Sequence, residues 1–210
     1  FSTDGGTIKL DGNYPTGTEN TALGDTALDS VQAGGNYNVV LGSRAGTNIT
    51  TGDNNVGVGA YALCDIQTNS QNVAIGTETL KKTIADNNTA VGYISLRCNT
   101  TGADNTSVGL CSLTANTTGC RNVSVGKGSL VSNTIGQQNT SLGFASMGDN
   151  TEGEFNTAIG SASLADNTTA NCNVAVGYNS LRKNTTGNSN TAVGTCSLND
   201  NTDGTGNSAV

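Results

Sequence analysis

Cysteine, asparagine and the acidic residues are the side chains whose types could do chemistry in this 210-residue chain, which contains no histidine. Without histidine there is no imidazole base, no His-ligated metal and no Ser-His-Asp triad. None of the six cysteines forms a Cys-x-x-Cys pair, and the acidic residues never form the Gly-Gly-x-Gly-x-Asp calcium repeat. We therefore expect a protein that is not an enzyme and that uses no cofactor and no metal.

Asparagine offers a second kind of chemistry, because nine Asn-x-Ser/Thr sequons occur in the chain. A sequon marks an acceptor for a glycan where the asparagine lies on an exposed loop. The better candidates for glycosylation lie in polar stretches: Asn99, Asn116, Asn167 and Asn184. A chain so rich in Asn and Thr also produces sequons by composition alone, and that alternative stays open.

Composition narrows the class of protein further. Gly, Asn, Thr and Ser account for just over half of the residues, and only 12% are charged and 4% aromatic. A compact enzyme needs more aliphatic and aromatic mass, whereas low charge and regularly spaced Val, Ile and Leu argue against disorder. The net charge is −7 and the nine basic residues are scattered, so we expect no nucleic-acid partner. Apolar runs are too short for membrane insertion.

Alignment on glycine reveals the organisation that must position these residues. A motif Asn, Thr/Val, small, aliphatic, Gly recurs in eleven full copies. The copies are nearly always 17 residues apart, as Gly92 and Gly109 are. Its predicted corner glycines are Gly24, Gly42, Gly59, Gly76, Gly92, Gly109, Gly126, Gly143, Gly160, Gly177 and Gly194. We number the repeat from its Asn: Gly is position five, Ser/Ala and Leu follow at eight and nine, and later copies carry Asn at twelve.

This period predicts an all-β parallel β-solenoid of about eleven 17-residue coils, in which equivalent residues stack about 4.8 Å apart. We expect two short strands per coil, positive φ at the corner glycines, and amide ladders of stacked Asn at positions one and twelve. The predicted core consists of the aliphatic residues at positions four and nine: Val91, Leu96, Val108, Leu113, Val125, Leu130, Ile159, Leu164, Val176, Leu181, Val193 and Leu198.

The repeat also sets the expected domains. Residues 1–19 form a leading segment or cap, and residues 20–210 form the repeat domain. Because the chain begins without Met and Val210 falls inside a motif, we expect the repeat to continue beyond residue 210 in a longer polypeptide. Two buried aliphatic residues per coil contribute too little to offset the entropy cost of ordering a whole coil. We therefore expect strand faces to pack against further copies of the chain.

The motif Asn-Thr-Ala-Val-Gly-x-x-Ser-Leu, as at 88–96, resembles the head repeats of trimeric autotransporter adhesins. It also resembles the repeats of phage tail fibres and of fibre proteins in large viruses, over about residues 20–210. The resemblance implies a left-handed β-roll and a homotrimer that forms a stiff attachment shaft or head. The 17-residue period is longer than that of the bacterial heads, and the Asn-Thr-Thr-Gly loop is closer to the viral and phage repeats.

Cysteines and aromatic residues each leave two alternatives open. A disulfide between stacked coils requires cysteine at the same position of two neighbouring repeats, and no neighbouring repeats meet this requirement. We therefore expect free thiols in a reducing compartment. Disulfides between corners or between chains are the alternative. The cysteines are Cys64, Cys98, Cys111, Cys120, Cys172 and Cys196. Position six carries Tyr93, Leu110, Phe144 and Tyr178, which suit contact between neighbouring chains or, alternatively, contact with carbohydrate.

These observations predict a rigid structural or attachment fibre on a virion or phage tail, located at the virion surface or outside the cell. Expected partners are two further copies, other virion or surface structural proteins, and a host-surface receptor or glycan. Free thiols favour a virus over the alternative, a bacterial surface adhesin head exported through an oxidising compartment. A remote alternative is an ice-binding β-solenoid, because Thr-Thr pairs recur at 100–101, 117–118, 168–169 and 185–186.

Overall fold

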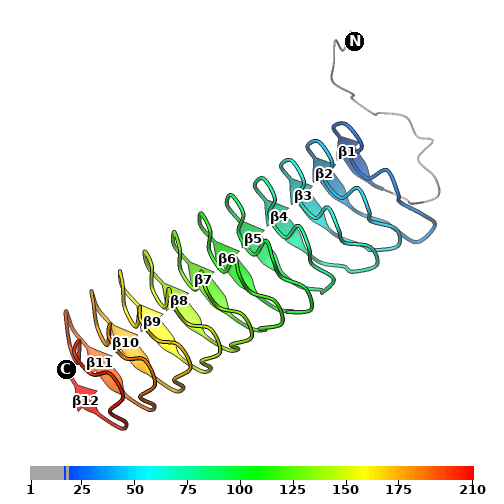
Figure 1. The fold of residues 1–210 in the computed structure, drawn as a ribbon. Helices are drawn as coiled ribbons and strands as arrows, with labels where there is room; N and C mark the ends of the chain where they lie inside the picture. Colours follow the sequence, from blue (N-terminus) through cyan, green and yellow to red (C-terminus); the bar gives the residue numbers. More distant parts are fainter. Residues whose placement is uncertain (1–16, 18) are drawn as a thin grey trace.

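The chain folds into a parallel β-solenoid of about eleven turns, seen in a computed structural model that describes residue 17 and residues 19–210. The predicted leading segment therefore lies almost wholly outside the described residues. Each coil contributes one short strand, and the strands follow one another along the axis (Figure 1). They are β1 (Thr21–Leu23), β2 (Val39–Leu41), β3 (Val56–Val58), β4 (Val73–Ile75), β5 (Thr89–Val91), β6 (Thr106–Val108), β7 (Val123–Val125), β8 (Thr140–Leu142), β9 (Thr157–Ile159), β10 (Val174–Val176), β11 (Thr191–Val193) and β12 (Ser208–Ala209).

All twelve strands form one parallel sheet in sequence order. Each strand residue pairs with the residue at the same repeat position in the next coil, as Ser107 does with Ser124. The length of the repeat therefore determines the register of the sheet. The 18-residue first repeat and the 16-residue repeat that begins at Asn72 keep this register, since Ala22 pairs with Val40 and Ala74 with Ala90. Their extra and missing residues lie outside the strands.

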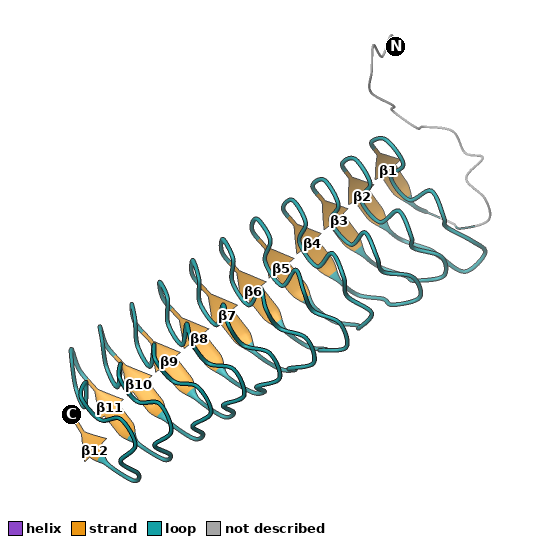
Figure 2. Ribbon diagram, in the orientation of Figure 1, coloured by secondary structure: helices purple, strands orange, loops and turns teal. Residues whose placement is uncertain are grey.

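Only one strand forms in each coil, so the expectation of a second strand was wrong. The chain returns from the corner glycine through turns at positions six to eleven, which form a second layer across the interior from the sheet (Figure 2). In this return segment the backbone has positive φ at positions seven and nine, for example 52° at Ile94 and 51° at Leu96. Left-handed residues cannot continue an extended strand.

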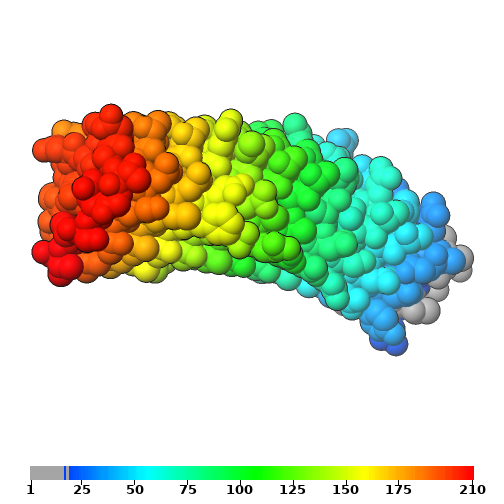
Figure 3. Space-filling model, turned by 90° about the horizontal axis from the view of Figure 1, so that it is seen from below, coloured from blue at the N-terminus to red at the C-terminus, as the bar shows by residue number. Residues whose placement is uncertain are grey.

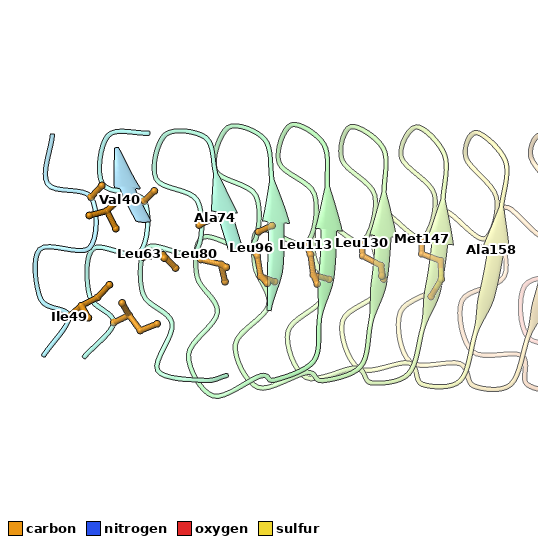
Figure 4. Packing of buried hydrophobic residues seen from close by; sticks show 14 of the residues in the cluster. Val40, Ile49, Leu63, Ala74, Leu80, Leu96, Leu113, Leu130, Met147 and Ala158 are labelled. Atoms are coloured by element: carbon orange, nitrogen blue, oxygen red, sulfur yellow. The ribbon is translucent and has the colours of Figure 1, made fainter. Parts of the chain in front are cut away.

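The apolar interior is filled by positions three, eight and nine, joined in the first three coils by position twelve, for example Ile49 (Figure 4). The predicted core leucines Leu96, Leu113, Leu130, Leu164 and Leu181 are fully buried, and Leu198 in the last complete coil is partly buried. Small residues at position three, such as Ala158 and Ala175, pack against them and are also fully buried. Serine hydroxyls add polar contacts inside this core: Ser112 Oγ and Ser124 Oγ lie 2.7 Å apart.

The prediction that position four belongs to the core was wrong. The position-four residues are half-buried or exposed and lie on the outer side of the sheet: Val91, Val108, Val125, Ile159, Val176 and Val193. The reason is the phase of strand alternation, because successive strand residues point to opposite faces. Asn at position one and the small residue at position three are fully buried, so positions two and four must face outward.

Exchanges of volume between positions three and nine keep the core filled in the second coil. This coil has Gly46 where the others have leucine or, in the eighth coil, Met147, and its position-three residue is the larger Val40. A Cβ at Gly46 would lie 2.9 Å from Val40 Cγ1, so the valine occupies the space that the missing leucine leaves. In the next coil the order reverses: Gly57 at position three faces Leu63.

Stacked coils make a gently curved rod with β1 and β12 near opposite ends (Figure 3). Twelve strands at the usual spacing of about 4.8 Å correspond to a sheet about 50 Å long. Within the described residues, no helix is long and apolar enough to cross a membrane.

Candidate functional site

The corner glycines hold neighbouring coils at a distance that admits no side chain. All eleven have positive φ, between 120° at Gly194 and 144° at Gly143. A Cβ at Gly109, for example, would lie 2.6 Å from the carbonyl oxygen of Gly126 in the next coil. The glycine column, meaning the stacked residues at one repeat position, therefore sets the close spacing on which every other column depends.

Asparagine at position one forms a continuous ladder inside the coil. The main-chain N–H of Asn122 donates to Asn105 Oδ1 at 3.0 Å, and Asn122 Nδ2 donates to the same oxygen at 3.2 Å and to the Gly136 carbonyl at 2.9 Å. From Asn38 onward, the main-chain N–H of each position-one Asn makes the first of these contacts. The ladder fixes the start of every strand and so sets which residues of the strand face outward.

A second ladder at position twelve contradicts the prediction of glycosylation. Asn99, Asn116, Asn167 and Asn184 are fully buried, and each Nδ2 is a donor inside the coil. Asn116 Nδ2, for example, donates to Asn99 Oδ1 at 2.7 Å and to the Gly119 carbonyl at 2.9 Å. A glycan needs this nitrogen at the surface, so these sequons follow from the structural role of the amide.

The outer face of the sheet is the most distinctive surface of the described chain. It consists of positions two and four in twelve consecutive repeats, and no residue at either position is charged. They are only Thr, Val, Leu, Ile and Ser. Ile75, Val123 and Leu142 expose 41, 40 and 46% of their surface. Exposed apolar patches of this kind are typical of interaction surfaces, so this face is the candidate site.

Exposed aromatic residues lie two positions before or after the outward-facing strand residues in several coils. Tyr93, Phe144 and Tyr178 at position six are each more than half exposed, and Leu110 in the same column is 41% exposed. Sequence reasoning found this column but missed Tyr37 and Phe155, which precede the Asn of the next repeat and are equally exposed. The signal was available in their position, because Tyr37 lies two residues before the outward-facing Val39, just as Tyr93 lies two residues after Val91.

The outer side of the return layer has the opposite character. Its positions seven, ten and eleven carry six of the eight Lys and Arg residues within the described part of the chain: Arg44, Lys81, Lys82, Arg97, Arg182 and Lys183. Acidic residues such as Asp65, Glu78 and Asp200 share these columns. The coil therefore presents one uncharged face and one charged face.

All six cysteines are free thiols, and four of them lie in the columns of the charged face. Burial raises the pKa of the Cys64 thiol above its ordinary value, and the Asp65 carboxylate raises it further, whereas Lys81 and Arg44 act in the opposite direction. Cys172 and Cys196 are exposed. Among residues 17 and 19–210, no group of three or more potential metal ligands comes together.

Stacked coils, two internal amide ladders and a glycine corner define this chain as a parallel β-solenoid repeat protein. Comparison with known proteins adds no closer identification: no family model, no curated protein and no solved structure matches the chain.

Proposed function

We propose that the chain is a structural and attachment segment: a rigid, homotrimeric fibre shaft or head at the surface of a virion, phage tail or cell. The observation that carries this proposal is the outer face of the sheet, because positions two and four include no charge in any repeat. A sheet face in contact with water normally carries polar and charged residues. A face without charged residues, flanked by exposed aromatic residues, suits burial against another copy.

The size of this face supports self-association. The twelve short strands cover about 50 Å by 10 Å, a projected area of about 500 Å². The five exposed aromatic residues at the strand ends add to it and bring it toward the lower end of specific interfaces, about 600 Å² per partner, although the same columns also carry charged residues such as Asp25 and Lys127. Identical copies match one another in length and repeat spacing, so a contact made in one coil recurs in every coil.

Three copies and a left-handed coil are the finer parts of the proposal. They rest on the resemblance of the Asn-Thr-Ala-Val-Gly-x-x-Ser-Leu motif to adhesin heads and to viral and phage fibres. Six free thiols are compatible with assembly in a reducing compartment, which favours the viral alternative over the bacterial one.

Ice binding receives less support from the contacts. An ice-binding face needs threonine hydroxyls that are available to order water. Six consecutive position-thirteen hydroxyls instead donate to the main-chain carbonyl of the next coil: those of Thr100, Thr117, Thr134, Thr151, Thr168 and Thr185.

Sedimentation equilibrium of the full chain tests the proposal directly. We expect a species of three times the 21.0 kDa chain mass that persists on dilution. Val123→Glu places a carboxylate on the sheet face of β7 and should convert this species to monomer, since a buried unpaired charge is strongly unfavourable. Val131→Glu makes the same change at position ten of the same coil, on the return layer, and should leave the trimer intact.

A wild-type chain that sediments as a monomer contradicts the proposal. So does a trimer that Val131→Glu dissociates and Val123→Glu does not, because the copies would then meet through the return layer.

A further inference from the structure

A connected cluster of cations surrounds Tyr61 on the charged face, in the second to fifth coils. Arg44 Cζ lies 5.5 Å and Lys81 Nζ 4.9 Å from the centre of the Tyr61 ring. Arg44 comes from the coil before Tyr61 and Lys81 from the coil after it, so the ring is flanked from both axial directions. Such cation–π contacts hold both long side chains in place.

Glu78 extends the cluster by one more coil. Its Oε1 lies 3.3 Å from Lys81 Nζ, and its Oε2 lies 2.6 Å from Arg97 Nε. A single carboxylate thus orients two cations and neutralises only one of them. Lys82, which directly follows Lys81 in the chain, is exposed.

On the charged face of these coils, cations outnumber acidic residues, in contrast to the chain as a whole. Arg44, Lys81, Lys82 and Arg97 are half of the Lys and Arg residues in the described range, and only Glu78 and Asp65 oppose them at positions seven, ten and eleven of these coils. The whole chain has a net charge of −7, so this cationic surface stands out against an acidic background. This face therefore attracts an anionic partner, while Asp53, Asp86 and Asp104 lie at other positions of the same coils.

We propose that Arg44, Lys81, Lys82 and Arg97 form a binding surface for an acidic polysaccharide that carries carboxylate or sulfate groups. This inference rests on the proposed attachment function, since it assigns the chemistry that the shaft contacts. The four residues span three coil steps, about 14 Å, which an acidic oligosaccharide of a few sugar residues covers. Their guanidinium and ammonium groups donate charge-assisted hydrogen bonds to carboxylate or sulfate oxygens.

A nucleic acid fits this surface less well. Single strands bind where bases stack on free aromatic faces, but Arg44 and Lys81 already cover Tyr61. A polysaccharide needs no such stacking platform, because it can be held through its anionic groups alone.

The chain supplies a matched control for the test. Arg182 and Lys183 stand at positions ten and eleven, the same positions as Lys81 and Lys82, but six coils further along. Here Asp166 and Asp200 occupy position eleven of the coils on either side, and Lys183 Nζ is bound to Asp200 Oδ1 at 2.7 Å. This second cation pair should therefore contribute little to binding.

The experiment titrates the full chain into labelled dextran sulfate, hyaluronate, neutral dextran and single-stranded DNA at physiological ionic strength. We expect binding to one or both acidic polysaccharides, with dextran sulfate reporting sulfate groups and hyaluronate reporting carboxylates. Lys81→Gln with Lys82→Gln should weaken it by about tenfold or more. Arg182→Gln with Lys183→Gln should change it by less than about twofold.

Four results would overturn the inference: no binding of either acidic polysaccharide, equal binding of neutral dextran, equal loss in both double variants, or tighter binding of DNA that depends on Lys81 and Lys82. The last result would identify a nucleic-acid partner instead. Sedimentation of the same samples distinguishes failure of this inference from failure of the fibre proposal. None of the four substitutions lies on the sheet face, so the variants should remain trimers even where they no longer bind polysaccharide.

Discussion

Asn99 donates a hydrogen bond from Nδ2 to Thr83 Oγ1 at 3.0 Å, and this contact joins two differently built parts of the coil interior. Before Thr83, position twelve is apolar and buried, with Val31, Ile49 and Ile66. After it, every position-twelve residue from Asn99 to Asn201 belongs to the amide ladder. The two chemical characters of threonine suit this junction: its methyl group is compatible with the apolar column, and its hydroxyl accepts the first amide of the ladder.

Replacing this hydroxyl should weaken the chain without changing its shape. Thr83→Val keeps the volume but leaves Asn99 Nδ2 with the Gly102 carbonyl as its remaining acceptor, and it removes the acceptor for the Ala85 N–H. We expect the free energy of unfolding in urea to fall by about 1–2 kcal/mol. The measurement is an equilibrium denaturation curve followed by circular dichroism.

Thr101→Val provides the comparison, because Thr101 is exposed at position fourteen. It should change the unfolding free energy by less than about 0.5 kcal/mol. Equal stability of wild type and Thr83→Val would mean that the junction hydroxyl contributes nothing to the ladder.

How far the sequence predicts this fold can be judged column by column. The 17-residue interval identifies the stacked residues, and the unbroken glycine column identifies the corner, because glycine alone readily adopts positive φ there and leaves room for the next coil. Position four could not be assigned from its residue type: Val and Ile suit a core and an intermolecular face equally well. The phase is set by Asn105 and its equivalents, whose burial depends on the ladder they form only once the coils are stacked.

The return layer was less predictable still. Leu96 and its equivalents adopt positive φ, a conformation that leucine disfavours and that no local pattern signals. Stacking imposes it, because the Leu96 N–H bonds to the Ser112 carbonyl in the next coil. The cluster around Tyr61 was missed for a related reason: its members are far apart in sequence and meet only when neighbouring coils are superposed.

Two glycines of the eighth coil should respond oppositely to alanine. Gly143 has a φ of 144°, and a Cβ there would collide with the main chain of Gly160. Gly143→Ala should therefore destabilise the chain by about 3 kcal/mol or more, because neither the backbone angle nor the spacing of the coils can adjust. Thermal unfolding, or loss of soluble protein where the effect is larger, measures this.

Gly148, at position ten of the same coil, lacks this constraint. A Cβ there meets only the Ala145 carbonyl oxygen at 3.5 Å, an ordinary contact. Gly148→Ala should be neutral or stabilise the fold by up to about 1 kcal/mol, since alanine restricts the unfolded chain. Similar losses in both variants would show that the glycine corner has no special role.

The Cys64 thiol should react slowly with alkylating reagents near neutral pH. Burial, followed by the Asp65 carboxylate, raises its pKa, and the thiolate is the reactive form. The pH at which iodoacetamide labelling reaches half its maximum rate should therefore lie above that of a cysteine in a short peptide. Mass spectrometry of the Cys64 peptide after timed quenching measures this midpoint.

Two substitutions should move this midpoint in opposite directions. Asp65→Asn removes a negative charge and a hydrogen bond that raise the pKa, so labelling should begin at lower pH. Lys81→Gln removes a positive charge that stabilises the thiolate, so labelling should begin at higher pH. A shift of both variants in the same direction would argue against this electrostatic cause, because burial of the sulfur alone cannot distinguish a lost anion from a lost cation.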